Sequence, residues 1–183
     1  PRQALESLRE PLETAEIHIA RATSRLRFPA RFQLVAAMNP CPCGYLGDTH
    51  HECRCTPHQI RQYCNRISGP LLDRIDLQIE VPRLSPAELD RLPVGETTAT
   101  VARRAHSARQ RQMRRDGCAA AQLSIEGIRQ SCHLDSAGRD IMRQATERLG
   151  LSARSWHRCL RVARTIADLN GDDQIQASQL REA

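Results

Sequence analysis

Lysine is absent from this 183-residue sequence, in which all 27 Lys or Arg positions are arginine. The absence excludes a phosphate-binding P-loop, which needs a lysine, and catalysis through a lysine Schiff base. Aromatic residues make up only 3% of the chain, which disfavours recognition of RNA or single strands by a sheet of stacked aromatic rings.

The sequence also lacks a long apolar run and an apolar leader. No run approaches the roughly 20 residues that span a bilayer, and Pro1-Arg2-Gln3 does not open a signal peptide. We therefore expect a cytoplasmic protein without a membrane partner. The missing initiator methionine predicts a fragment of a longer protein. The formal net charge of +6 weakly favours an anionic partner.

Helix and strand patterns alternate in the first half of the chain. The patterns predict a helix over 2–12, a β-hairpin over 16–28 and an alternating strand over 76–81. The nearly continuous apolar run over 32–38 is typical of a strand buried on both faces of a parallel sheet. Shorter helices are predicted from Thr56-Pro57, over 71–74 and from Ser85-Pro86.

Only helical patterns follow residue 94. They cover 97–116, 124–131, 136–149, 152–169 and the residues from 176 on. We therefore predict an α/β fold over 1–94 and an all-α domain over 95–183.

Four of the eight cysteines gather in one loop, residues 39–56. Cys41 and Cys43 form one C-x-C pair, and Cys53 and Cys55 form another. Without a secretory signal, a metal site is favoured over a disulfide framework. Four thiolates suit a closed tetrahedral zinc site, which predicts a structural metal with no open position for a catalytic water.

Alternatives to this zinc site remain. In one alternative, a histidine replaces one cysteine as a metal ligand, the candidates being His50, His51 and His58. In the other, the four cysteines bind no metal and are unpaired or redox-sensing thiols. Cys64 and Cys159 fall on apolar helix faces and are predicted to be small core residues.

Two long stretches carry a resemblance to a known family. They are Phe28-Pro-Ala-Arg-Phe-Gln-Leu-Val-Ala-Ala-Met-Asn-Pro-Cys-Pro-Cys-Gly44 and Ile67-Ser-Gly-Pro-Leu-Leu-Asp-Arg-Ile-Asp76. They resemble the Mg-chelatase-like AAA+ proteins of the ComM/YifB type, and 149–169 is similar to the C-terminal helical domain of that family. The resemblance implies the second half of an AAA+ P-loop ATPase core, followed by a helical lid.

The resemblance also implies a function. It implies a hexameric ring ATPase that binds ATP and Mg and acts on DNA as a helicase or branch-migration motor in competence. Neither Walker motif is present in this sequence, so we expect no ATP hydrolysis by this chain alone. The rivals are an ATPase subunit for metal insertion into porphyrin, and a non-enzymatic zinc module that binds nucleic acid or protein.

By matching positions, the resemblance assigns three residues to nucleotide chemistry. Asn39 resembles sensor 1, Arg74 the arginine finger and Arg154 sensor 2, so Asn39 and Arg154 are expected to contact the nucleotide. The alternatives are a strand-end cap for Asn39, an ion pair of Arg74 with Asp73 or Asp76, and Arg158 in place of Arg154.

The hairpin resembles the pre-sensor-1 hairpin of related motors. Arg21 and Arg25 at its tip are expected to contact DNA phosphates, and the alternative is an ordinary surface hairpin. The arginines of 97–116 are a further candidate DNA surface. Arg161 and Arg164 are expected at the surface or between domains.

Overall fold

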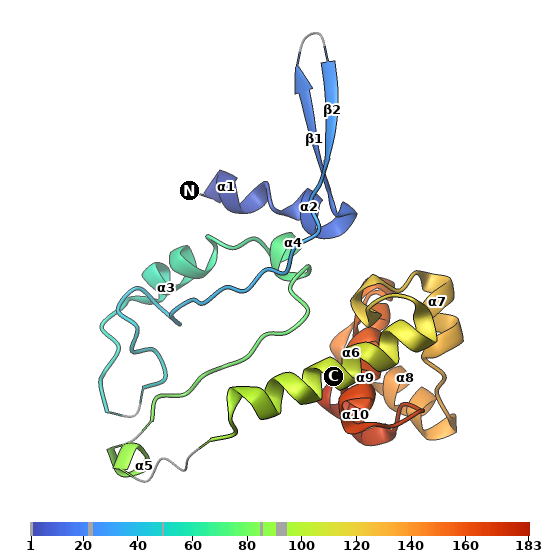
Figure 1. Cartoon of the computed structure of the whole chain (residues 1–183). Coiled ribbons are helices and arrows are strands. Elements are labelled where there is room, and N and C mark those ends of the chain that lie inside the picture. The colour runs from blue at the N-terminus through green and yellow to red at the C-terminus, as the bar shows by residue number, and fades with distance from the viewer. Residues whose placement is uncertain (1, 22–23, 49, 85, 91–94) are drawn as a thin grey trace. The chain divides into compact units, whose positions relative to one another are not determined.

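A computed structural model describes residues 2–21, 24–48, 50–84, 86–90 and 95–183 (Figure 1). The chain divides into two compact units, Pro1–Ser85 and Pro86–Ala183. The first unit carries the hairpin and the cysteine loop, and the second is helical. Among the described residues, no helix is both long and apolar enough to cross a membrane.

The first unit opens with two short helices, α1 (Arg2–Glu6) and α2 (Arg9–Thr14), where the sequence predicts one over 2–12. Pro11 accounts for the break. A proline interrupts the helical turn that precedes it, because its ring clashes with the carbonyl group four residues back. Proline also has no backbone N–H to donate to that carbonyl. Ala15 ends α2 in the left-handed conformation, with φ at 59°, and its N–H bonds to the Pro11 carbonyl.

The predicted hairpin is confirmed. Strands β1 (Glu16–Arg21) and β2 (Ser24–Pro29) pair antiparallel, with Ile17 opposite Phe28. The predicted tip at 22–23 lies outside the described residues. The apolar pairs share one face of the hairpin, because side chains alternate between faces along a strand.

The strands predicted over 32–38 and 76–81 are wrong for this chain. Both segments are described without strand structure, and their apolar side chains face solvent: Val35 is 84% exposed, Ile79 80% and Val81 85%. Among the described residues, β1 and β2 form the whole sheet. A central strand needs a neighbour on each side to pair its backbone groups, and these segments have none there.

Two helices follow the cysteine loop. Helix α3 (Pro57–Cys64) begins at Thr56, which forms a capping box with Gln59. Helix α4 (Gly69–Leu72) is capped by Ser68 and buries Leu71. Both start with proline in the first turn, where a missing N–H costs nothing.

The second unit matches the helical prediction closely. Its elements are α5 (Pro86–Asp90), α6 (Thr98–Asp116), the 3₁₀ turn η1 (Ala120–Gln122), α7 (Ile125–Ser131), α8 (Ser136–Leu149), α9 (Ala153–Asn170) and α10 (Ala177–Glu182). Serine, threonine or aspartate side chains cap α6, α7, α8 and α9, and a left-handed glycine ends α6, α8 and α9. These are the start and stop signals on which the prediction depends. The Ser85 cap predicted for α5 lies outside the described residues.

The core of the second unit surrounds α9, which contacts α6, α7, α10 and η1. Its buried members are Ala120, Leu123, Ile128, Cys132, Met142, Leu160, Ala163, Ala167, Ile175 and Leu180. Trp156, the chain's one tryptophan, packs against this core.

A buried ion network lies beside the core. Arg164, which is 1% exposed, donates to Asp168 and to the carbonyls of Asp172 and Asp173. Arg115 of α6 binds the same Asp168 carboxylate with both terminal nitrogens, at 2.6 and 3.0 Å. The expectation of a surface or interdomain Arg164 is therefore wrong, because its guanidinium ties α9 to the loop that follows it.

Candidate functional site

The four cysteines of the loop come together. The Sγ atom of Cys41 lies 3.3 Å from that of Cys43 and 3.7 Å from that of Cys53, and Cys43 and Cys53 are 3.6 Å apart. With the Sγ atom of Cys55 included, the four sulfurs lie within 4.8 Å of one another. A tetrahedron of thiolates with metal–sulfur bonds of about 2.3 Å has edges of about 3.8 Å. The cluster therefore has the size that a four-thiolate metal ion requires.

Backbone N–H groups support these sulfurs. The N–H of Tyr45, with help from neighbouring thiols, holds the pKa of Cys43 at about 6 although burial opposes it. Cys53 accepts from the N–H of Cys55, but burial and the neighbouring sulfurs together raise its pKa to about 12. Thiols this close cannot all ionise unless a cation is shared among them. The donor set therefore fits a metal that binds all four as thiolates.

The rest of the loop is held by polar contacts. Asp48 accepts from the backbone N–H groups of His50 and His51, at 2.7 and 2.9 Å, and forms an ion pair with Arg83 at 3.2 Å. These bonds lower the pKa of Asp48 to about 2. The His51 ring stacks on Tyr45, with 4.9 Å between centroids. Among the described residues, the metal-binding group is made of the four cysteines, and no histidine joins it.

The remaining cysteines divide into two environments. Cys64 is exposed, so its prediction as a core residue is wrong: α3 has no buried residue. Cys159 packs against the helical core as predicted, and Cys132 lies within it.

Asn39 follows the extended segment 32–38 and is exposed. Its carboxamide lies near Gly44 of the cysteine loop, since a methyl group added at Gly44 would lie 3.8 Å from its Nδ2 atom. Gly44 has φ at 84°, which a side chain would strain. The position therefore places an amide beside the four-cysteine cluster.

Arg74 lies two residues after α4 and is engaged within the first unit. Its guanidinium forms an ion pair with Glu13 of α2 and donates to the Pro70 carbonyl at 2.6 Å. The side chain is 14% exposed. Glu13 is a partner that the sequence prediction missed, because 61 residues separate the two and no local pattern joins them.

Arg154 belongs to the second unit. It is exposed and stands in the first turn of α9, whose N-cap Ser152 accepts the N–H of Ser155. The positive end of the helix dipole lies there, and an anion at this position is favoured. Arg158, the alternative, is half-buried one turn later.

The two hairpin arginines are both exposed, but they lie on opposite faces. Arg21 pairs with Ser24 on the face that carries Ile17 and Ile19, whereas Arg25 pairs with Ala20 on the other face. The predicted contact of Arg21 and Arg25 with DNA phosphates stays a prediction.

Two family models match the chain in succession. The model described as magnesium chelatase, subunit ChlI, matches residues 1–89, and that of the ChlI C-terminal region matches 95–183. The chain belongs to the magnesium chelatase ChlI-like family.

Within the ChlI-like family the chain is of the ComM/YifB type. It is 46% identical to the uncharacterized protein YifB of Escherichia coli and 48% identical to the competence protein ComM of Haemophilus influenzae. Both alignments cover all 183 residues, but only 36% of each relative. The uncharacterized protein Rv2897c of Mycobacterium tuberculosis is 40% identical over 172 residues, which are 92% of this chain and 34% of that protein. The chain thus spans about a third of the length of these relatives.

In this ChlI-like chain, the described geometry brings one predicted set of site residues together. The four cysteines converge. Asn39 and Arg74 belong to the first unit and Arg154 to the second. Their predicted roles at a nucleotide stay predictions.

Proposed function

We propose that this chain supplies the C-terminal part of a ComM-type AAA+ ATPase, a hexameric ring that uses ATP to drive DNA branch migration. The chain would hold the second half of the ATPase core over 1–94 and the helical lid over 95–183. The name of the ComM relative, a competence protein, supports DNA as the client.

The observation that carries this proposal is the exposure of two apolar segments. Residues 32–38 form a nearly continuous apolar run and residues 76–81 an alternating one, yet Val35, Leu77 and Val81 are 84%, 62% and 85% exposed. Soluble proteins rarely expose contiguous apolar surface without a partner that covers it. A parallel sheet completed by the rest of an ATPase core would cover both segments.

Three polar residues then take distinct roles. The Asn39 amide, directly after segment 32–38, would orient the attacking water, because it donates and accepts without a change of charge. Arg74 would reach the phosphate of a neighbouring subunit and neutralise charge that develops during transfer. For this role Arg74 would leave the Glu13 carboxylate and bind a phosphate oxygen instead. The paired N–H groups of a guanidinium match carboxylates and phosphates equally. Arg154 would bind phosphate from the helical lid.

Zinc in the cysteine cluster would have a structural role. The described residues of the loop bury one apolar side chain, Cys41 at 0% exposure, while Tyr45 and Leu46 are 40% and 42% exposed. Such a loop has little apolar burial to hold it, so metal binding would contribute its folding free energy.

The test is ATP hydrolysis by the complete gene product, with and without DNA. We expect DNA to stimulate hydrolysis, and Arg74→Ala to lower kcat by 10³-fold or more, the range typical of arginine fingers. Glu13→Gln is the matched control, because it removes the same ion pair and leaves the guanidinium in place. A loss of kcat in Glu13→Gln equal to that in Arg74→Ala would assign Arg74 a structural role.

A subunit-mixing experiment tests whether Arg74 acts between subunits. Arg74→Ala subunits are mixed with subunits inactivated in their own ATP site. We expect partial recovery of hydrolysis, since an intact finger then meets an intact site at mixed interfaces.

No DNA stimulation, together with stimulation by a porphyrin, would refute the DNA motor in favour of the metal-insertion rival.

A further inference from the structure

Helix α3 and the residues beside it form a basic surface without acidic side chains. From residue 53 to residue 72 the sequence holds no Asp or Glu, but it holds Arg54, Arg61 and Arg66. All three arginines are exposed. Within the described ranges, none of the three guanidiniums has a carboxylate partner. We call Arg54, Arg61, Tyr63 and Arg66 the α3 basic face.

Several arginines elsewhere in the chain have carboxylate partners. Arg104 of α6 binds Glu96 with two hydrogen bonds of 3.0 Å, and Arg115 binds Asp168. In the hairpin, Arg27 lies 3.5 Å from Glu16. The uncompensated charge of the α3 basic face therefore distinguishes it from these positions, and charge complementarity favours a polyanion on it.

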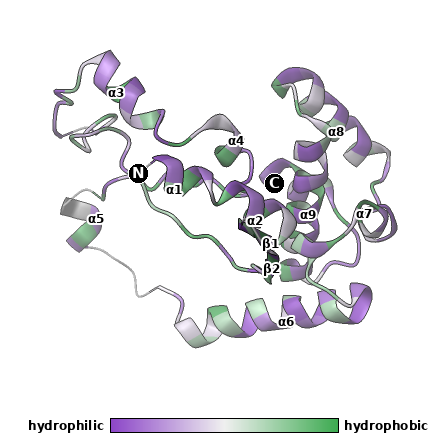
Figure 2. Cartoon of the chain, turned by 90° about the horizontal axis from the view of Figure 1, so that it is seen from above, coloured by the Kyte–Doolittle hydropathy of each residue, from purple (hydrophilic) through white to green (hydrophobic). Residues whose placement is uncertain are grey.

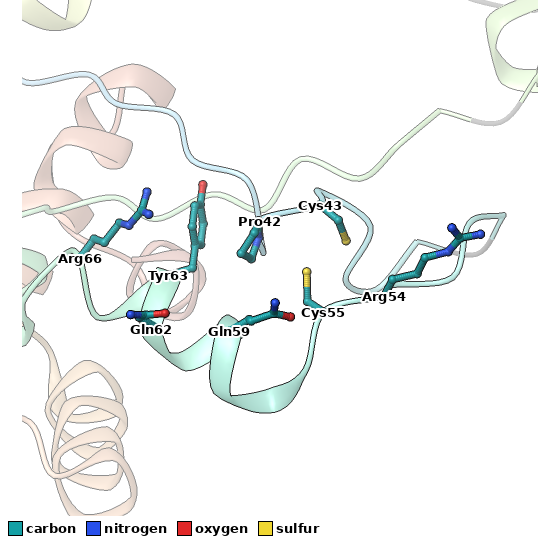
Figure 3. A pocket seen from close by; sticks show the side chains of 8 residues that line it. All are labelled: Pro42, Cys43, Arg54, Cys55, Gln59, Gln62, Tyr63 and Arg66. Atoms are coloured by element: carbon teal, nitrogen blue, oxygen red, sulfur yellow. The ribbon is translucent and has the colours of Figure 1, made fainter.

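Two hollows flank α3. One, of about 340 Å³, is lined by Pro42, Cys43, Arg54, Cys55, Gln59, Gln62, Tyr63 and Arg66 (Figure 3). The other, of about 360 Å³, is lined by Arg2, His58, Arg61, Gln62, Asn65 and Arg66. Gln62 and Arg66 border both. Each hollow thus combines guanidinium groups with side-chain amides, the donors that most often contact phosphate oxygens and base edges.

One aromatic ring stands in this surface. Tyr63 is half-buried, and the Arg66 guanidinium carbon lies 5.3 Å from the centre of its ring. Figure 3 shows the two side chains next to each other at one end of the hollow, with Arg54 at the other end. A ring and a guanidinium placed together provide a contact for an unpaired base beside a contact for its phosphate.

We propose that the α3 basic face binds single-stranded DNA through its phosphates, with one base against Tyr63. This inference rests on the proposed DNA motor and names a contact surface apart from the hairpin. Concave hollows on both sides of a short helix suit a flexible strand, which can bend over α3 and lower successive nucleotides into them. A duplex has a persistence length of about 150 bp and therefore resists bending over so short a helix.

The four-cysteine cluster is part of this surface. Cys43 and Cys55 line the first hollow together with Arg54 and Tyr63, and Figure 3 shows their sulfurs facing each other between the two arginine ends. The position of Arg54, between ligands Cys53 and Cys55, therefore depends on the cluster. Metal removal should weaken DNA binding as well as loop stability.

The experiment measures binding of a fluorescent single-stranded oligodeoxynucleotide to the complete gene product over a range of salt concentrations. The variant is the triple change Arg54→Ala, Arg61→Ala and Arg66→Ala. The control is Arg129→Ala, which removes an exposed arginine of α7 that lies 3.7 Å from Glu126. Metal content and hydrolysis without DNA are measured on every variant, and both should be unchanged in the triple variant.

We expect the triple variant to bind at least tenfold more weakly and to lower the salt slope by about 2, because each lost phosphate contact on a single strand contributes about 0.7. Tyr63→Ala should weaken single-strand binding and leave the salt slope unchanged. A chelator should weaken wild-type binding.

Several outcomes would overturn the proposal. They are an unchanged affinity in the triple variant, an equal loss of duplex binding, and competition by polyglutamate as strong as that by the oligonucleotide, which would indicate an acidic protein partner. If the wild-type protein binds no DNA at all, the proposed DNA motor fails. If it binds DNA and the triple variant binds equally well, only the α3 basic face fails.

Discussion

Replacement of Asp168 by alanine should unfold the helical unit at much lower denaturant concentration. The Asp168 side chain is 1% exposed and accepts three charge-assisted hydrogen bonds, two from Arg115 and one from Arg164. It is the single carboxylate that joins α6 to α9 in this network. The change would leave one fully buried guanidinium, that of Arg164, without its counter-ion.

The size of the effect follows from these contacts. Hydrogen bonds to charged groups contribute about 1.5–3 kcal/mol each, so three give an upper limit of about 4.5–9 kcal/mol. Arg115 is 28% exposed in its side chain and can regain water, and Arg164 keeps the carbonyls of Asp172 and Asp173. We therefore expect a loss of about 3–5 kcal/mol, as for other broken buried pairs. That is a large part of the 5–15 kcal/mol that stabilises a typical domain.

The assay is urea unfolding followed by tryptophan fluorescence. Trp156 is the one tryptophan of the chain and packs against the helical core, so its signal reports this unit alone. Asp140→Ala is the control, because its ion pair with Arg143 is exposed and should contribute less than about 1 kcal/mol. Asp168→Asn should fall between the two. A loss below about 1 kcal/mol in Asp168→Ala would refute a stabilising role for the network.

Three further predictions concern the cysteines and the loop. Burial raises the pKa of Cys132 to about 11, so at pH 8 a maleimide should modify the exposed Cys64 well before Cys132. Peptide mass spectrometry of the labelled chain measures the two rates, and equal rates would contradict the burial of Cys132. Cys41→Ser should lower bound zinc, measured by elemental analysis, whereas Cys64→Ser should leave it at the wild-type level; zinc retained in Cys41→Ser would argue against the four-thiolate site. The pKa of Asp48 is lowered to about 2, so its contribution to loop stability is complete well above pH 4 and is lost as the pH falls from about 4 towards 2. Over that range the protection of the His50 and His51 amides from hydrogen exchange, relative to the intrinsic rate at each pH, should fall. The same pH profile in Asp48→Asn would contradict the assignment.

Local signals predicted the helical unit well, because its helices carry their own boundaries. Ser152 and Gly171 limit α9, and Asp135 and Gly150 limit α8. The apolar stripe of α9 also predicted that this helix lies in the core of the helical unit. The sequence did not predict that Arg164 and Asp168 lie inside the core, since an i, i+4 ion pair has the same pattern on a surface as in an interior.

The strand predictions failed for a different reason. Composition reports that a segment such as 32–38 suits burial, but a strand exists only when another strand pairs with it. The hairpin contains both of its partners within 14 residues and was predicted correctly. Figure 2 shows the contrast with α6, where hydrophilic and hydrophobic bands alternate along an element that needs no partner strand to form.

The cysteine site was predictable because its ligands are local, whereas the setting of Arg74 was not. Two C-x-C pairs bring four sulfurs together with one loop closure between them. Arg74 instead meets Glu13 through tertiary structure, and Asp48 meets Arg83 across 35 residues. Sequence spacing identifies chemistry held within a turn and does not identify partners supplied by a distant element.

The two units depend on different interactions, and this difference has a functional consequence. The helical unit buries a ten-residue apolar cluster, and such a cluster can stabilise a fold without a ligand. In the described part of the first unit, the buried side chains are Pro11, Cys41 and Leu71. That unit therefore depends on polar contacts, on the thiol cluster and, in our proposal, on the remainder of an ATPase core. Because Arg54, Arg74 and Asn39 all lie in the unit with the smaller core, their positions would respond to metal and to neighbouring protein, whereas Arg154 rests on a helix that the apolar core already fixes.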